Sequence, residues 1–462
     1  MNEVLIISDD LTGACNSASY FIKNSCGIKV LLECTNITEE TLNSLRNDEV
    51  VVLNTNTRTE EKKQVYLKIK KLSRLIPFLG KKLLIKKIDT AYRGNVAIEL
   101  DAIIEVLDLK LCFIINSIPS MGRITVGGFQ IINGKVLENT EFTDDPYDKI
   151  KTSFIPDILG KSLKRKIGLV SLQDIKKGLN YIQKKIKINV SKGNEILVFD
   201  SVTNSDIESI IFSAQKLYKS NIWEKILWVG SLALIEIFSN YLFKNSGITC
   251  DEKLNFSKNH QTSQLKSRLD TKKVLGISAS IYEKTKQQIK KAEKLGFIKI
   301  MEIDISKFIK EVYFNKTYDN LNNQIIEINY DNIDFQNNLD NVIETIEFEF
   351  KEKNIFLIPK VKMKLKTKKI EKIILRILSI ILEKLSHKIE IINEIERLIL
   401  IGGETSFYIL KALNTKTIQI KGKIEDGIDY GVILDGVLIG KEIVIKGGSV
   451  GNKDAVVKMI LY

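Results

Sequence analysis

The sequence predicts an α/β protein of two domains, each a mainly parallel sheet flanked by helices. Short apolar runs pass directly into polar turns and then into helical patterns, first near Val4 and again near Arg397, which is typical of βα units. The chain of 462 residues also exceeds what a single hydrophobic core usually holds. Because α/β domains bind ligands beyond the carboxyl ends of their strands, polar residues at those ends are the candidate site residues.

The domain boundaries are predicted from a change in composition. From about residue 244 to 272 the apolar periodicity gives way to Asn, Ser, Gln and Lys without a sustained pattern, as is typical of a linker. We therefore expect a first domain over residues 1–248, a linker over 249–272 and a second domain over 273–462.

The composition argues against nucleic-acid and membrane partners. The net charge is +13, from 70 Lys and Arg against 57 Asp and Glu, but the lysines are scattered and do not cluster with aromatic residues as in a nucleic-acid site. Five cysteines without a C-x-x-C pair indicate reduced thiols. The start of the chain has no secretory pattern, and charges interrupt the apolar stretch Ile370–Leu385. We therefore expect a cytoplasmic protein and an amphipathic helix in that stretch.

The first predicted strand begins at Val4 and ends in two adjacent acids, Asp9 and Asp10, before a helix that opens with small residues. Neighbouring carboxylates repel each other, so a magnesium ion, a ligand hydroxyl or a proton to be accepted would explain the pair. The alternative is structural: one acid caps the helix and the other faces water. These residues alone leave both interpretations open.

The third and fourth predicted strands also end in charged turns. Arg58 follows the third strand, and Lys87, Asp89 and Arg93 follow the fourth. Arginine grips a carboxylate with two hydrogen bonds, lysine supplies a point charge, and aspartate accepts from hydroxyls, so this set suits an anionic, hydroxyl-rich ligand. The alternative is a surface ion-pair network that contributes little to stability.

The rest of the first domain continues the pattern of strands and helices. Asn133-Gly134 between short apolar runs predicts a hairpin, because this dipeptide is the strongest two-residue hairpin signal. Helices are predicted over residues 60–75 and 97–107, and strands over 167–172, 196–199 and 226–231.

The second domain opens with a strand from Lys273 whose turn carries Ser280. Further along, an apolar strand breaks at Gly402 and Gly403 and a helix begins, so its first-turn amides and its dipole favour a phosphate. A last β-rich segment carries Gly448. Neither G-x-x-x-x-G-K-[ST] nor G-x-G-x-x-G occurs, so the fingerprints of Walker-type nucleotide hydrolases and of dinucleotide-binding domains are missing.

Together these stretches resemble the four-carbon acid sugar kinase family over essentially the whole chain. The matching motifs are, in order, residues 9–14 (DDLTGA), 54–58 (NTNTR), 86–95 (KKIDTAYRGN), 122–126 (GRITV), 141–142 with 145–146 (EF, DP), 402–406 (GGETS) and 446–448 (KGG).

The resemblance implies phosphorylation of the terminal hydroxyl of a four-carbon sugar acid, such as threonate, erythronate or 3-oxo-tetronate, by ATP with Mg²⁺. The first domain would bind the acid and the second would bind ATP, with the active site in the cleft between them. By position, the substrate-binding residues are Asp9, Arg58, Lys87, Asp89 and Arg93, with Asp10 as the catalytic acceptor of the hydroxyl proton or a magnesium ligand. The nucleotide-binding residues are Ser280, Gly402, Gly403, Glu404, Thr405 and Gly448.

Two departures from the family pattern bear on these roles. The family's Gly-Ser-Cys-Ser-Pro is here Ala279-Ser280-Ile281-Tyr282-Glu283, and Tyr92 stands beside the substrate loop, where it is expected to influence which acid fits. The alternative function is a sensor that binds sugar acid and nucleotide without turnover. The sequence assigns no metal ligands and leaves a homo-oligomer open.

Overall fold

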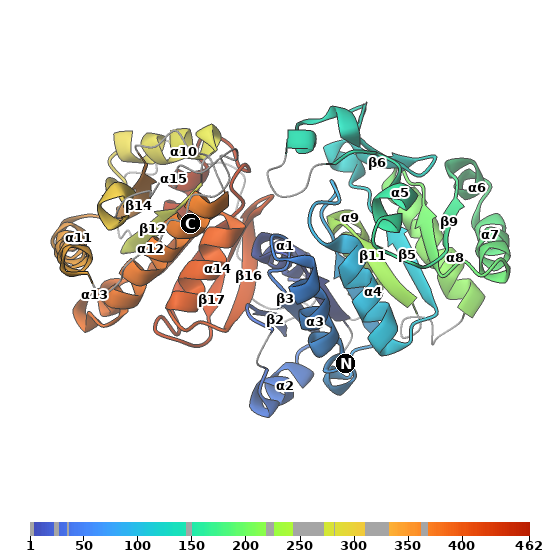
Figure 1. Cartoon of the computed structure of the whole chain (residues 1–462), viewed down its shortest axis with the longest axis horizontal. Helices are drawn as coiled ribbons and strands as arrows, with labels where there is room; N and C mark the ends of the chain where they lie inside the picture. The colour runs from blue at the N-terminus through green and yellow to red at the C-terminus, as the bar shows by residue number, and fades with distance from the viewer. Residues whose placement is uncertain are drawn as a thin grey trace, which may run out of the picture. The chain divides into compact units, whose positions relative to one another are not determined.

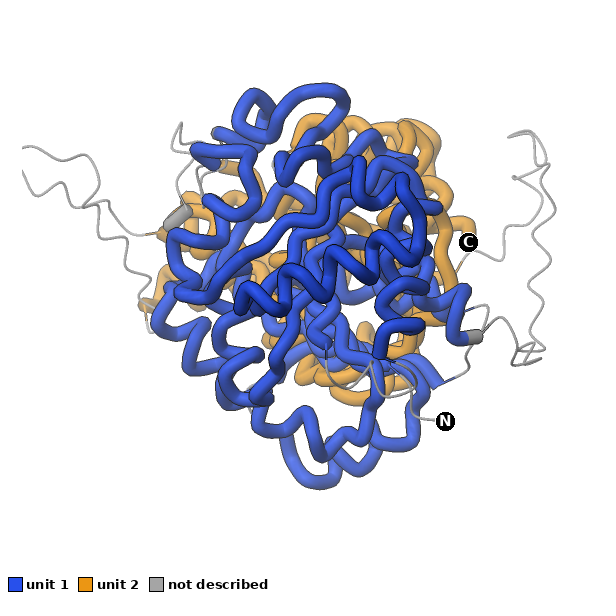
Figure 2. The backbone as a smooth tube through the Cα atoms, turned by 90° about the vertical axis from the view of Figure 1, so that its right-hand side faces the viewer, with its two compact units in different colours: residues 1–253 blue, residues 254–462 orange. Residues whose placement is uncertain are grey.

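The structure, a computed structural model, describes residues 4–22, 27–34, 37–144, 150–218, 226–243, 272–280, 282–309, 332–361 and 368–462. The chain forms two compact units, residues 1–253 and 254–462 (Figure 2). Each unit contains a mainly parallel sheet with flanking helices (Figure 1), which confirms the predicted fold class. Apart from Lys272, the predicted linker over residues 249–272 lies outside the described residues.

The first unit is built on a parallel sheet with the strand order β2-β3-β1-β4-β11-β5-β10-β9. Its strands are β1 (Val4–Ser8), β2 (Ile28–Leu31), β3 (Val50–Asn54), β4 (Leu83–Lys87), β5 (Leu111–Ile115), β9 (Ile167–Val170), β10 (Ile196–Phe199) and β11 (Ile226–Gly230). Its helices are α1 (Leu11–Ser19), α2 (Glu39–Arg46), α3 (Lys62–Ser73), α4 (Val96–Leu107), α5 (Ile155–Gly160), α6 (Leu172–Lys176), α7 (Leu179–Ser191), α8 (Asn204–Tyr218) and α9 (Leu232–Phe243).

The register of the central strands brings three turns to the same level. β1 lies between β3 and β4, and Ser8 at its end is aligned with Asn54 on β3 and with Lys87 on β4. The segments that follow these three residues therefore leave the sheet side by side at its carboxyl edge. The candidate substrate residues all lie in these segments or at the end of β4.

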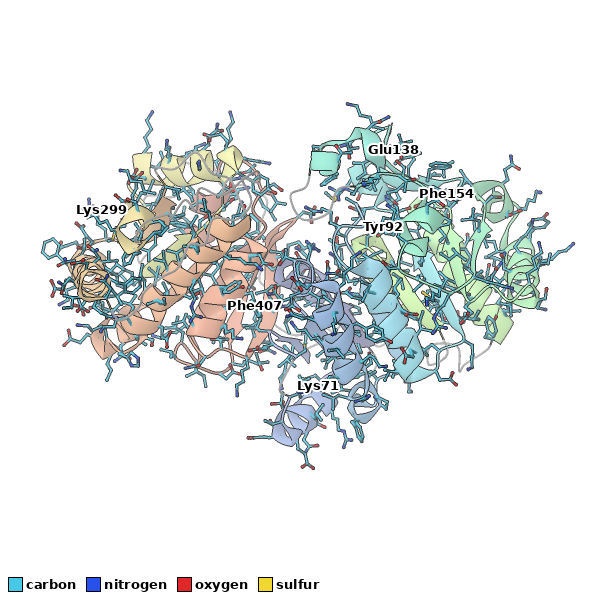
Figure 3. The ribbon with its side chains drawn as sticks, in the orientation of Figure 1. Lys71, Tyr92, Glu138, Phe154, Lys299 and Phe407 are labelled. Carbon is cyan, nitrogen blue, oxygen red and sulfur yellow. The ribbon has the colours of Figure 1, made fainter. Side chains whose placement is uncertain are left out.

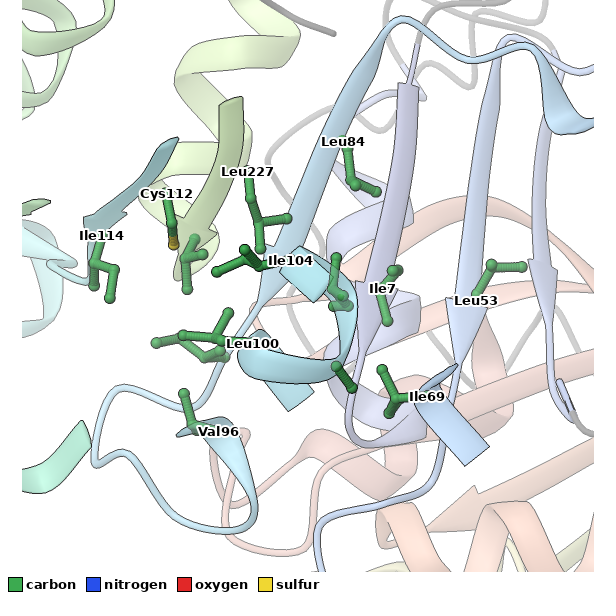
Figure 4. Close-up of a cluster of buried hydrophobic side chains, with 14 of the residues drawn as sticks. Ile7, Leu53, Ile69, Leu84, Val96, Leu100, Ile104, Cys112, Ile114 and Leu227 are labelled. Carbon is green, nitrogen blue, oxygen red and sulfur yellow. The ribbon is translucent and has the colours of Figure 1, made fainter. Parts of the chain in front are cut away.

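Both faces of this sheet are buried. Leu5 and Ile7 of β1 belong to a cluster that includes Ile69 of α3 and Leu100 of α4 (Figure 4). Because side chains alternate along a strand, Ile6 points to the opposite face, where it is also fully buried. The strands β1, β3 and β5 are accordingly almost continuous apolar runs, as expected for a parallel sheet covered on both sides.

A small antiparallel sheet follows β5 and consists of β6 (Arg123–Val126), β7 (Phe129–Ile132) and β8 (Lys135–Val136). The turn between β7 and β8 is Asn133-Gly134, with φ values of 51° and 77°, which confirms the predicted hairpin. The strand predicted to reach Leu172 ends instead at Val170, because Ser171 caps α6 and its hydroxyl accepts a hydrogen bond from the Asp174 amide.

The second unit has the strand order β13-β14-β12-β15-β18-β17-β16, in which β17 runs antiparallel to both of its neighbours. Its strands are β12 (Val274–Ser278), β13 (Lys299–Asp304), β14 (Ile355–Lys360), β15 (Arg397–Ile401), β16 (Thr417–Glu425), β17 (Ile428–Ile433) and β18 (Glu442–Lys446). Its helices are α10 (Glu283–Lys294), α11 (Ile333–Glu352), α12 (Lys368–Ser386), α13 (Ile389–Glu394), α14 (Gly403–Ala412) and α15 (Ala455–Leu461).

The predicted amphipathic helix corresponds to α12, whose apolar side chains, including Ile377 and Leu378, are buried. Within the described ranges, no helix is both long enough and apolar enough to cross a membrane.

Candidate functional site

Arg58 joins the two acids that follow β1. Its Nε and Nη2 donate to the two carboxylate oxygens of Asp9 at 2.7 and 2.9 Å, and its Nη1 and Nη2 donate to those of Asp10 at 3.0 and 2.9 Å. The guanidinium therefore offsets the repulsion between the adjacent carboxylates. Their proximity in turn raises the pKa of Arg58 well above its usual value, against the opposing effect of burial.

The backbone holds Arg58 in this position. The amides of Thr57 and Arg58 donate to the carbonyl oxygen of Asp9 at 3.1 and 3.4 Å. Gly94 packs against the Arg58 segment with a φ of +89°, and a Cβ at this glycine would lie 3.1 Å from Cγ of Arg58. A larger residue would be strained in this conformation and would press on the arginine.

Asp10 has two roles in the structure. It caps α1, because its Oδ1 accepts from the Gly13 amide at 3.1 Å, and its Oδ2 accepts from the Thr12 hydroxyl at 2.6 Å. Burial alone raises the pKa of Asp10, but Arg58 and Lys87 outweigh that effect and lower it to about 2. The structural alternative is thus correct in part. Asp10 caps the helix, but Asp9 is buried, forms an ion pair with Arg58 and does not face water.

Lys87 and Asp89 bring further charge to the same edge of the sheet. The Lys87 ammonium lies 4.0 Å from Oδ1 of Asp10. Arg93 donates to both oxygens of Asp89 at 2.8 and 2.9 Å, and despite burial the pKa of Asp89 is lowered well below its usual value by this arginine. Lys87 and Asp89 are each only 8% exposed, so the interpretation as a surface network is wrong for them.

Sequence reasoning missed a buried ion pair beneath these residues. Lys86 on β4 and Glu99 on α4 are both fully buried, and the Lys86 ammonium lies 2.7 Å from the Glu99 carboxylate. The Thr57 hydroxyl also donates to Glu99. Because Thr57 precedes Arg58 and Lys86 precedes Lys87, this network links the segments that carry two site cations. Because side chains alternate along a strand, the sequence shows that Lys86 and Lys87 point to opposite faces of the sheet. It does not show that Glu99 is the partner of Lys86.

Two aromatic residues near the site have different roles. The Phe142 ring lies against the guanidinium groups of Arg93 and Arg123, with Cζ atoms 5.2 and 5.8 Å from its centroid. Tyr92 (Figure 3) has a left-handed φ of 55° and is buried in the hydrophobic cluster of the sheet, at 2% exposure. Its ring is therefore unavailable to a ligand, contrary to the expectation that it influences which acid fits.

The predicted nucleotide residues meet at one edge of the second sheet. β15 lies between β12 and β18, and the turns after these strands contain Ser280, Gly402 and Gly448. The Ala279 amide donates to the Thr405 hydroxyl at 3.4 Å. A Cβ at Gly448 would lie 3.3 Å from Oγ of Ser280 and 3.0 Å from the Tyr282 ring, so a larger residue here would displace these side chains.

Gly402 caps α14 with a φ of 104°, and α14 begins with Gly403, Glu404 and Thr405. A left-handed φ of this kind favours glycine, and the first-turn amides of α14 can donate hydrogen bonds to an anion. The six predicted nucleotide residues thus lie in three adjoining turns.

A buried lysine, Lys446, lies beneath the same edge of the second sheet. Sequence reasoning assigned it no role. Lys446 is fully buried, and its ammonium donates to the carbonyl oxygen of Gly447 at 2.9 Å and approaches that of Gly448 at 3.5 Å. No described carboxylate forms an ion pair with it. Burial and the nearby Lys284 lower the pKa of Lys446 to about 8. A buried cation without a counter-charge fits an anionic ligand.

The described residues contain no group of three or more His, Cys, Asp or Glu side chains arranged to hold a metal ion. Magnesium in phosphoryl-transfer sites is usually held by one or two carboxylates together with the substrate phosphates. Asp9 and Asp10 are the site carboxylates that would take such a role, and in the structure the oxygens of both accept hydrogen bonds from Arg58.

Comparisons with known proteins match both units. A model described as a sugar-binding N-terminal domain matches residues 4–237, and one described as a nucleotide-binding C-terminal domain matches residues 275–456. A D-erythronate kinase of Heliobacterium modesticaldum is 23% identical across 100% of this chain and 97% of its own length. A D-threonate kinase of Salmonella typhimurium is 26% identical across 67% of this chain and 65% of its own length.

Solved structures agree on the fold. A Haemophilus influenzae protein superimposes with a TM-score of 0.67 at 17% identity, covering 98% of both chains. A Salmonella typhimurium protein superimposes with a TM-score of 0.71 at 15% identity, covering 99% of this chain and 98% of the other.

The fold, the site and the two domain matches define the class as an α/β protein with a sugar-binding domain followed by a nucleotide-binding domain. Within that class, the chain belongs to the four-carbon acid sugar kinase family.

Proposed function

We propose that this protein is a kinase that uses ATP to phosphorylate the terminal hydroxyl of a four-carbon sugar acid, such as erythronate, threonate or 3-oxo-tetronate. The observation that carries the proposal is the buried charge cluster in the domain that matches the sugar-binding model. There Asp9, Asp10, Arg58, Lys87 and Asp89 converge at one edge of the sheet. The names of relatives that match this chain at 22–26% identity support the reaction class.

In this proposal the first unit positions the acid. Asp10 stays ionised at neutral pH because its pKa is about 2. The reacting hydroxyl would take the place of one of its present donors, such as the Thr12 hydroxyl, and would be oriented by the carboxylate. A carboxylate with so low a pKa is a weak base. Phosphoryl transfer depends mainly on positioning and charge neutralisation, so a weak base is sufficient. Lys87 is placed to neutralise charge on the acid or on the transferred group.

The second unit would hold the nucleotide. The first-turn amides of α14, which begins at Gly403, and the Gly448 turn suit phosphate oxygens, and Lys446 supplies positive charge beneath that turn. ATP supplies the phosphoryl group, and Mg²⁺ neutralises its charge when both are bound.

A coupled assay of ADP formation tests this function. The purified full-length protein is given ATP, Mg²⁺ and, one at a time, D-erythronate, D-threonate and 3-oxo-tetronate. ADP that forms only when one of these acids is present supports the proposal. Formation of no ADP with any of them, under conditions where the acid and nucleotide bind, would identify a sensor instead.

Two variants sharpen the assay. Asp10→Asn should lower kcat by about 10²-fold or more, because an amide does not replace an ionised acceptor. Asp108→Asn is the control, because Asp108 is 83% exposed in its pair with Lys110. Near wild-type turnover by Asp10→Asn would show that the assigned role is wrong.

A further inference from the structure

Arg123 lies at the substrate edge of the first sheet although its own strand belongs to the small antiparallel sheet. The amide of Ile118 donates to the carbonyl oxygen of Arg123 at 2.7 Å, and the Arg123 amide donates back to Ile118 at 3.2 Å. Ile118 is three residues beyond the end of β5 at Ile115. The Arg123 guanidinium donates to the hydroxyl of Thr90, which adjoins Asp89.

The ion pairs of the site leave the charge of Arg123 unmatched. Arg58 is bound to Asp9 and Asp10, and Arg93 is bound to Asp89. Arg123, by contrast, has a neutral hydroxyl as its hydrogen-bond partner, and it forms no ion pair with any carboxylate that the structure describes.

The surroundings of Arg123 hold the guanidinium in place without a direct ion pair to a described carboxylate. Phe142 lies 5.8 Å from its Cζ and 5.2 Å from that of Arg93. The negative face of an aromatic ring attracts both cations and so offsets their mutual repulsion. A guanidinium stacked on a ring keeps its N–H groups, which lie in its own plane, for a planar anion. Burial and Arg93 lower the pKa of Arg123, and the more distant charges of Asp89 and Glu141 offset this only in part, so an anion bound directly to the guanidinium would be favourable.

We propose that Arg123 binds the carboxylate of the sugar acid and thereby selects acids over neutral four-carbon sugars. This inference rests on the proposed function, and it names the group that recognises the acid. A carboxylate offers one negative charge and two oxygens, which match the single unmatched charge and the paired donors of Arg123. Thr90 orients the guanidinium. The hydroxyls of the acid are then left to Lys87 and the aspartates.

The test compares an acid with its uncharged counterpart. Binding of D-erythronate and of D-erythronamide, which has the same carbon skeleton, is measured by calorimetry with wild type and Arg123→Met; the same is done with D-threonate and its amide. Arg123→Met should weaken binding of the preferred acid by about 10- to 100-fold and change binding of the amide by less than about 3-fold. Arg123→Lys keeps the charge without the paired donors, so it should lie between the two proteins.

The control is Arg165→Met, which removes an arginine paired with Asp101 and Glu195. It should leave the preference for the acid unchanged. Thermal melting verifies that each variant is folded. If Arg123→Met does not fold, the comparison is made with Arg123→Lys alone. If the variants of Arg123 prefer the acid over the amide as strongly as wild type does, the proposal is overturned. Failure of the wild type to form ADP would instead refute the proposed function, because binding is measured separately.

Discussion

Replacing Glu99 by glutamine would leave Lys86 charged and buried without its carboxylate. Both side chains are fully buried and their charged atoms are 2.7 Å apart. Breaking a buried ion pair by removing one partner typically costs about 3–5 kcal/mol, because the remaining charge stays in a medium that solvates it poorly. We therefore expect Glu99→Gln to lower the free energy of unfolding of the first unit by about 3–5 kcal/mol. The segment that carries Arg58 should also loosen, since Thr57 donates to Glu99.

Tryptophan fluorescence measures this change in the right part of the chain. Trp223 and Trp228, the two tryptophans of the sequence, both fall within residues 1–253, and Trp228 is fully buried on β11. Urea unfolding followed at this signal therefore reports the first unit, and kcat/KM for the preferred acid reports the effect on the site.

Two further variants separate the buried charge from a general effect of substitution. Asp108→Asn breaks the exposed pair with Lys110 and should cost less than about 1 kcal/mol. Combining Lys86→Met with Glu99→Leu replaces both charges by apolar groups and should recover most of the loss. If Glu99→Gln costs less than about 1 kcal/mol, or if the double variant is no more stable than the single one, the reasoning about an uncompensated buried charge is wrong.

Three other predictions follow from the charges and glycines of the site. The carboxylate of Asp10 has a pKa of about 2 in the folded chain against 3.8 normally, so it adds stability above about pH 4 that is lost as the pH falls to 2. Asp10→Asn should therefore cost about 2 kcal/mol at pH 6 and nothing near pH 2, as measured by urea unfolding across that range. Gly94→Ala should lower kcat/KM for the acid more than Gly80→Ala does. Both glycines have a positive φ, but only a Cβ at residue 94 meets Arg58, and one at residue 80 meets nothing within 4 Å. Equal effects would refute the steric argument. Lys446→Met should weaken ADP binding by about 10-fold at pH 7. Because the pKa of Lys446 is about 8, wild-type affinity should fall towards that of the variant as the pH rises through 8. A titration that shows no such convergence would contradict a role for this cation.

Much of the candidate site in the first unit could be predicted because of one geometric rule. The carboxyl ends of adjacent parallel strands meet at one edge, so charged residues placed after β1, β3 and β4 had to lie close together. Asp9, Arg58 and Asp89 were identified in this way, and the structure places them at one edge. The same rule brought Gly402 and Gly448 together in the second unit, after β15 and β18.

The features that the sequence did not reveal are contacts of the parallel strands with other elements, to which the rule about adjacent strand ends does not apply. Lys86 resembles any other lysine in a lysine-rich chain, and its partner Glu99 is on a helix whose rotation over the sheet is set by packing. Arg123 lies in a separate small sheet, so only tertiary structure brings it to Thr90. The GRITV motif pointed to that segment without giving its function. Tyr92 was misjudged because its left-handed backbone turns the ring into the core.

The ion pairs of Arg58 also bear on the entropy of ligand binding. A free arginine side chain loses roughly 2 kcal/mol of rotamer entropy when it is fixed in one conformation. Here four hydrogen bonds to Asp9 and Asp10, which belong to the same unit, fix Arg58. That loss therefore accompanies the folding of the first unit and not the arrival of a ligand. A ligand that meets this edge of the sheet encounters a charge pattern that is already ordered, and more of its interaction energy remains available as affinity.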